Sequence, residues 1–260
     1  MIELNADTAR RAIVEHTQRL AEAAATAGPA AAVPTAPEWT VTELVAHLGQ
    51  TQNWVAEIVE RRITDPTQLP TEVVALPADP GEWTEWLSAA ARRVTSACSD
   101  DALDAPVFNA ATDGRTGTQF WLSSMLNEAV VHGFDGAAAA GRPAEVEAGV
   151  ATALITNHFA MLTSPTWAMQ RPESAQALRG SGQTLQWRAT DTAAAWFVER
   201  QPAGVTWRPE TRPADVTVTG PAGALLLALT RRGPLAGDVT IEGDPALAQH
   251  WVDHSAHVSG

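Results

Sequence analysis

Hydrophobic positions in the first two-thirds of the chain recur every three or four residues, the spacing that puts side chains on one face of a helix. A first helix is predicted over residues 5–27, because Gly28 and Pro29 follow its last turn. A second is predicted from Thr40, which forms a capping-box pattern with Glu43, to about residue 63. Further helical stretches are predicted at residues 79–98, 118–140 and 145–162. Long helices joined by loops favour an up-and-down bundle.

The pattern changes after about Thr163, where short segments alternate or carry β-branched and aromatic residues. Strands are predicted at residues 182–189, 194–199, 205–208, 215–219 and 239–241. Two helices are predicted among them, at residues 221–232 and 245–254. We therefore expect an N-terminal up-and-down four-helix bundle over residues 1–165 and a smaller C-terminal α+β domain over residues 166–260.

Composition and charge exclude several classes of function. The chain has 260 residues, and all 17 of its basic residues are arginine, which excludes a Schiff-base lysine and a P-loop lysine. With 30 acidic residues the net charge is −13. Such a chain repels phosphates, so we expect no binding to nucleic acid or to anionic membranes.

The single cysteine, Cys98, cannot form an internal disulfide, which excludes a disulfide-stapled secreted scaffold. The first sixteen residues carry charges every few positions and lack the apolar run of a signal peptide. The longest apolar runs, such as residues 222–229, are far too short to span a membrane. We therefore expect a cytoplasmic protein, and a monomer because no surplus amphipathic face is evident.

One stripe of the helix predicted at 118–140 changes from apolar to ionisable along its length. Its members follow one another at spacings of four, three, four and three: Trp121, Met125, Glu128, His132 and Asp135. Glu128 and His132 therefore share a face beside core positions. Because an unpaired buried carboxylate is strongly unfavourable, a positive group should face Glu128.

His47 occupies a similar position in the second predicted helix, on an apolar stripe with Leu44 and Ile58. Two imidazoles and one carboxylate on the inward stripes of two helices suit Zn²⁺ and leave coordination positions open, as catalytic sites require. Two simpler interpretations stay open. His47 can be a hydrogen-bonded core residue, and Glu128 with His132 can be a pair on a helix surface.

The chain resembles the mycothiol-dependent maleylpyruvate isomerase family in three stretches that follow the family's order: EWTVTELVAHLGQTQNWV, NEAVVHGFDGAAAAGRP and LLLALTRRGPLAGDVTIEGDPAL. The resemblance covers nearly the whole chain. It implies a DinB-like metal-binding bundle followed by a domain that is similar to sterol carrier proteins. It also implies that His47, Glu128 and His132 are the metal ligands, with Asp135 supporting them from behind.

The resemblance extends to the reaction. The family has an arginine that engages substrate at the end of the apolar helix in the second domain, and Arg232 matches it best. Arg231 stands where a glycine is common in the family, so the assignment of the substrate-binding arginine between Arg231 and Arg232 stays open. The alternative for both is a structural role, since basic residues are favourable at the C-terminal end of a helix. Mycothiol would be the thiol cofactor or co-substrate, and a small electrophile the substrate. An isomerase adds the thiol and expels it after bond rotation, whereas an S-transferase keeps the new bond, and the same ligands serve both.

Two other functions stay open on the same scaffold. A metal-activated hydrolase would activate water in place of a thiol. A non-catalytic protein would hold an apolar ligand in its second domain, as sterol carriers do, and its metal would be structural. Structural zinc sites have four protein ligands, and the sequence offers three, which favours an enzyme.

Overall fold

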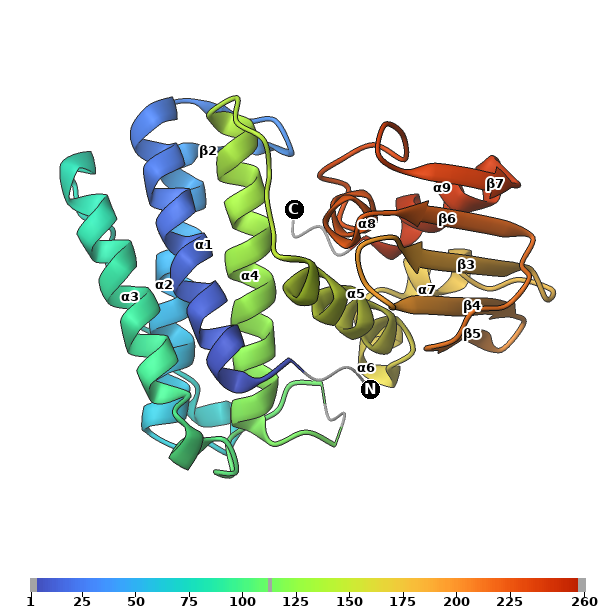
Figure 1. Ribbon diagram of the computed structural model, residues 1–260. Coiled ribbons are helices and arrows are strands. Elements are labelled where there is room, and N and C mark those ends of the chain that lie inside the picture. The colour runs from blue at the N-terminus through green and yellow to red at the C-terminus, as the bar shows by residue number, and fades with distance from the viewer. Residues whose placement is uncertain (1–3, 112–113, 257–260) are drawn as a thin grey trace. The chain divides into compact units, whose positions relative to one another are not determined.

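The computed structural model describes residues 4–111 and 114–256 (Figure 1). The chain forms two compact units, one from Asn5 to Glu145 and one that begins at Val146. None of the helices among the described residues has the length and hydrophobicity needed to cross a membrane.

The first unit is built on long helices that run up and down (Figure 1). They are α1 (Ala6–Ala27), α2 (Val41–Glu60), α3 (Trp83–Ala97) and α4 (Gly117–Ala139). Fully buried leucines from the first three, Leu20, Leu44, Leu48 and Leu87, form the centre of a core cluster. Short 3-10 turns interrupt the loops at η1 (Pro66–Gln68), η2 (Pro80–Glu82) and η3 (Asp100–Ala102).

Two contacts fix α4 against its neighbours. A Cβ atom added at Gly136 would lie 2.6 Å from Leu20 Cδ1, so the absence of a side chain lets α1 approach α4 closely. The α4 face that carries Gly133 and Gly136 therefore packs on α1. Glu128 lies on another face of α4 and contacts α2.

A two-stranded hairpin joins α1 to α2, and the sequence pattern does not predict it. Strand β1 (Ala32–Val33) pairs antiparallel with β2 (Ala36–Thr40), and β2 ends at the residue that caps α2. Because β1 has only two residues, it has no alternation from which a strand could be recognised. Two side chains of this hairpin, Thr35 and Trp39, contact residues of α4 that belong to the site described below.

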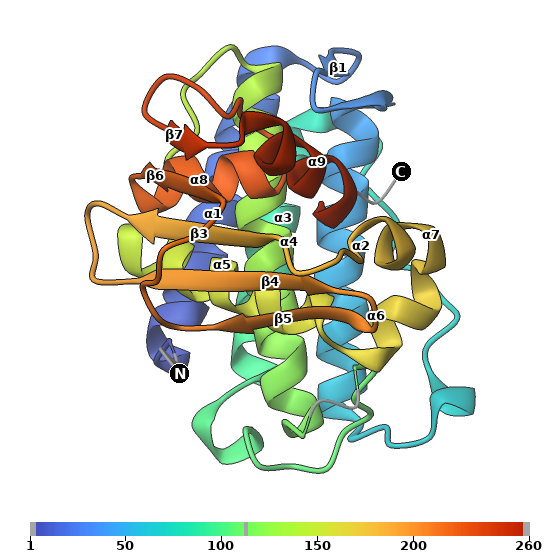
Figure 2. The same cartoon turned by 90° about the vertical axis from the view of Figure 1, so that its right-hand side faces the viewer.

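The second unit contains a five-stranded sheet in the order β5-β4-β3-β6-β7. The strands are β3 (Thr184–Ala189), β4 (Ala195–Gln201), β5 (Gly204–Arg208), β6 (Val216–Gly220) and β7 (Thr240–Gly243). Only the β3–β6 pair is parallel among these described strands. Helices α8 (Ala222–Leu229) and α9 (Pro245–Ser255) pack against the sheet, whose strands Figure 2 shows side by side. Two short helices that were not predicted, α6 (Pro165–Gln170) and α7 (Pro172–Ala177), precede it.

Helix α5 (Ala148–Leu162) belongs to the second unit, although the expected boundary at residue 165 puts it with the bundle. It packs along α8, and its Phe159 lies at the centre of a cluster of aromatic rings. These rings are Trp187, Trp196, Trp207 and Trp251. The α+β core therefore needs α5 as a covering helix. The predicted fold class, a helical bundle followed by a smaller α+β domain, is confirmed.

Candidate metal centre

Helix α2 places His47 two turns from a firmly capped start. The Thr40 backbone N–H donates to Glu43 Oε2 at 2.6 Å, and Thr40 Oγ1 accepts from the Glu43 backbone N–H at 3.4 Å. This is the capping box that the sequence predicts. The capping box fixes where α2 begins, and the helical repeat then determines the face from which the His47 side chain projects.

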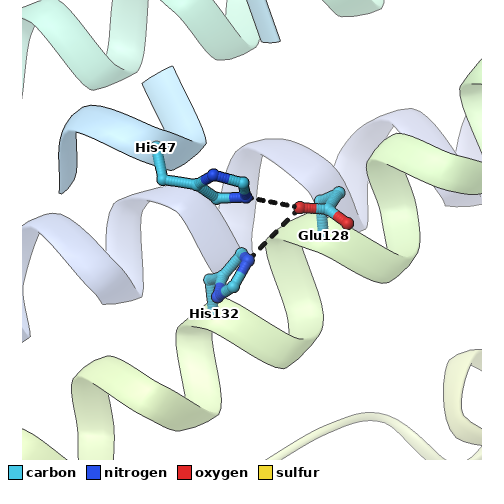
Figure 3. Close-up of side chains that lie close together, drawn as sticks. All are labelled: His47, Glu128 and His132. Atoms are coloured by element: carbon cyan, nitrogen blue, oxygen red, sulfur yellow. Dashed lines mark hydrogen bonds and ion pairs between the residues drawn. The ribbon is translucent and has the colours of Figure 1, made fainter. Parts of the chain in front are cut away.

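The structure brings the three predicted ligand residues together between α2 and α4 (Figure 3). Glu128 Oε2 lies 3.0 Å from His47 Nε2 and 3.2 Å from His132 Nε2. One potential ligand atom from each side chain lies within 4.8 Å of the other two. Glu128 and His132 are one turn apart on α4, whereas His47 is 81 residues earlier than Glu128. Two nitrogens and one carboxylate oxygen that converge in this way form a donor set that suits a divalent cation such as Zn²⁺.

Asp135 orients His132 from the side away from Glu128. Its Oδ2 lies 2.9 Å from His132 Nδ1, and the Asp135 side chain is fully buried. Its other oxygen, Oδ1, accepts a hydrogen bond of 2.5 Å from Thr35 Oγ1. Carboxylates that hold the second nitrogen of a histidine are typical of metal centres, since they fix which nitrogen carries the proton. A proton on Nδ1 leaves Nε2 as the atom that faces Glu128 and His47.

Hydrogen bonding decides the charge of this cluster. Burial alone would raise the pKa of Glu128, but hydrogen bonds with His132 and His47 outweigh it and hold the pKa below its ordinary value. Burial alone would lower the pKa of His132, but hydrogen bonds to Asp135 and Glu128 raise the pKa to about 9. Near neutral pH the protein without metal therefore pairs a carboxylate with a protonated imidazole. A divalent cation can replace that proton, because it binds the same nitrogen and oxygen.

Trp39 forms a wall of the site that the sequence analysis missed. Its ring centre lies 5.0 Å from that of His47 and 5.8 Å from that of His132, and it stacks on His132 at an interplanar angle of 28°. Trp39 directly precedes the Thr40 N-cap of α2, and no spacing in the sequence links it to the ligand residues. Two further tryptophans, Trp54 of α2 and Trp121 of α4, contact each other edge to face with ring centres 5.4 Å apart.

The side chains of the cluster are not equally exposed. His132 is 8% exposed, whereas Glu128 is 23% and His47 is 32% exposed. A cation held by these three side chains would be anchored on the buried side by His132. Its accessible side would lie towards His47.

Arg232 lies in the second unit, just after α8. Its Nη1 donates to the Thr230 carbonyl oxygen at 2.8 Å. Its predicted contact with substrate stays a prediction. Arg231 has a φ of 58°, in the left-handed region that favours glycine, which explains why a glycine suits this position at the end of the helix.

Comparisons with known proteins agree with this architecture. A family model described as the mycothiol maleylpyruvate isomerase N-terminal domain matches residues 10–137, and one described as the MDMPI C-terminal domain matches residues 145–250. A crystal structure of the mycothiol-dependent maleylpyruvate isomerase aligns with a TM-score of 0.55 at 13% identity, covering 92% of this chain and 93% of that one. A histidine-to-alanine mutant of that enzyme aligns at 0.58 and 15% identity, with the same coverage of 92% and 93%. No curated protein matches the sequence.

Proposed function

Because the chain belongs to the mycothiol maleylpyruvate isomerase family, we propose that it is a Zn²⁺-dependent enzyme that uses mycothiol and acts on a small electrophile, by cis-trans isomerisation or by S-transfer. The observation that carries the proposal is the convergence of His47 Nε2, Glu128 Oε2 and His132 Nε2 on one point between two helices. Three protein ligands leave room for a further group on the metal, as catalytic zinc sites require.

Zn²⁺ at this centre would supply a Lewis acid that lowers the pKa of a nearby thiol. The chain's residues would do the rest. His47, Glu128 and His132 would bind the ion, and Asp135 would keep His132 in the orientation that ligation needs. Arg232 would hold an anionic group of the substrate, since arginine pairs well with carboxylates.

The chain's own cysteine is poorly suited to be the nucleophile. Cys98 is fully buried, and burial raises the pKa of its thiol to about 12. A thiol with such a pKa stays protonated near neutral pH and reacts slowly. This observation supports an external thiol as the reactive group, in agreement with the mycothiol named in the family description.

Metal analysis tests the ligand assignment. We expect about one zinc per chain in the purified protein, and a large loss of zinc in both His47→Ala and His132→Ala. His254→Ala is a matched control, because His254 lies in α9 of the second unit and bonds to the backbone of His250. Zinc that survives both substitutions at the centre would overturn the assignment.

A screen of electrophiles, with and without added mycothiol, tests the reaction. Chromatography coupled to mass spectrometry should find S-conjugates if the enzyme is an S-transferase. If it is an isomerase, the product should have the mass of the substrate and a different retention time, with the thiol recovered. Either product should depend on the thiol. Cleavage of an ester or amide in the absence of thiol would refute the proposal in favour of a hydrolase.

A further inference from the structure

Thr35 connects the β1–β2 hairpin to the candidate metal centre. It lies in the turn between the two strands, 100 residues before Asp135, and its hydroxyl donates to Asp135 Oδ1 at 2.5 Å. The other oxygen of the same carboxylate bonds to His132 Nδ1 at 2.9 Å. A continuous path of hydrogen bonds therefore runs from the hairpin through Asp135 to the imidazole.

The chemistry of this path has a direction. An ionised carboxylate only accepts hydrogen bonds, so the Thr35 hydroxyl must donate to Oδ1. This bond restrains the rotation of the Asp135 side chain and keeps Oδ2 directed at His132 Nδ1. When a cation displaces the Nε2 proton, the proton held at Nδ1 by Asp135 leaves Nε2 as the nitrogen that binds the cation, on the side of Glu128 and His47.

The same hairpin also restrains the ring from its face. Trp39, in β2, stacks on His132 at 5.8 Å between ring centres. Thr35 restrains the imidazole through the Asp135 hydrogen bond to Nδ1, at the edge of the ring, and Trp39 restrains it by stacking on its face. The hairpin therefore limits both the rotation and the tilt of His132.

We propose that Thr35 is a positioning residue for the metal centre, which sets the orientation and the proton position of His132 through Asp135. This inference rests on the proposed function, because it concerns the use of His132 as a metal ligand. Thr35 would not contact the metal or the substrate. Its effect would appear as a gain in metal affinity, because a ligand that is already oriented loses less freedom on binding.

The experiment measures Zn²⁺ affinity by competition with a chelator, in the wild type and three variants. Thr35→Val removes the hydroxyl and keeps the shape of the side chain, and we expect it to weaken Zn²⁺ binding about tenfold. Thr35→Ser keeps a hydroxyl and should restore affinity to near the wild-type value. Thr42→Val is the matched control, since the Thr42 hydroxyl bonds to the Pro29 carbonyl oxygen at 3.0 Å and does not belong to the path. It should bind Zn²⁺ as the wild type does.

A second readout separates positioning from general stability. In the Zn²⁺-loaded protein, the Nδ1 proton of His132 should give a downfield NMR signal in the wild type and in Thr35→Ser. This signal should move upfield in Thr35→Val, because Asp135 is less firmly held. If Thr35→Val does not fold, Thr35→Ala takes its place in both measurements.

The outcomes distinguish this inference from the proposed function. A wild type that fails to bind Zn²⁺ stoichiometrically overturns the proposed function, and the inference with it. A wild type that binds Zn²⁺, together with a Thr35→Val variant of equal affinity and unchanged Nδ1 signal, overturns the inference alone. Equal weakening in Thr35→Val and Thr42→Val also overturns it, because the loss would then reflect the stability of the hairpin.

Discussion

A buried histidine outside the metal centre should make the first unit sensitive to acid. His16, in α1, is 3% exposed and lies edge-on to Phe134 of α4, with ring centres 6.5 Å apart. Burial, with a smaller effect of the Arg19 charge, lowers the pKa of His16 from 6.5 to about 4. The folded protein thus keeps this imidazole neutral under conditions in which the unfolded chain protonates it.

The sign of the effect follows from proton binding. Between pH 4 and 6.5 the unfolded chain binds a proton at His16 that the folded chain does not, so this contribution to stability is present above pH 6.5 and is lost as the pH falls towards 4. A pKa difference of about 2.5 units, at about 1.4 kcal/mol per unit, gives a loss of roughly 3–4 kcal/mol. This is a large part of the stability of a typical domain.

The loss is measured as the change in the free energy of urea unfolding of the metal-free protein between about pH 4.5 and 7.5. Hydrogen exchange of the amides in α1 identifies which unfolding transition belongs to the first unit. His16→Gln cannot titrate, so its free energy of unfolding should fall less on acidification than that of the wild type. Arg19→Gln should reduce the loss only slightly, because burial is the larger cause of the low pKa. Equal acid slopes in the wild type and His16→Gln, within about 0.5 kcal/mol, would refute the reasoning.

Three further substitutions test other parts of the structure. Asp135→Asn should weaken Zn²⁺ binding about 10- to 100-fold in chelator competition, because an amide holds the His132 Nδ1 proton less well than a carboxylate; an unchanged affinity would contradict this role. Arg231→Gly should raise the unfolding free energy of the second unit by about 0.5–1 kcal/mol, since Arg231 has a φ of 58°, and a less stable variant would count against it. Gly49→Ala should lower the free energy of unfolding by about 1–3 kcal/mol, because its Cβ would lie 2.1 Å from Trp86 Cζ3; an unchanged midpoint in urea would show that the ring moves freely.

The helices of the first unit could be predicted because residues that are close together in the sequence determine their ends and their buried faces. Thr40 with Glu43 predicts the start of α2, and Gly141, which follows α4 with a φ of 64°, predicts an end. The apolar stripes predict which faces turn inward. Since Glu128 and His132 share one such stripe and His47 lies on another, the cluster could be inferred one helix at a time.

What could not be predicted depends on contacts between distant segments. The Thr35–Asp135 bond spans 100 residues, and the hairpin that carries Thr35 is too short to leave a periodic signal. The same limit explains the assignment of α5. Its helical pattern was recognised, but its partner could not be, because Phe159 packs against tryptophans that follow in the next hundred residues of the chain.

The long separation of the ligands has a thermodynamic consequence. His47 and Glu128 are 81 residues apart, so the donor set does not exist in an unfolded chain and forms only when α2 and α4 pack together. A cation that binds the folded bundle alone must stabilise it in proportion to the logarithm of its concentration over the dissociation constant. Metal affinity and bundle stability are therefore linked. Asp135 and Thr35 orient His132 without contacting the ion. Because they restrict the rotation of the imidazole before the ion binds, they would contribute to metal affinity and, through it, to the stability of the bundle.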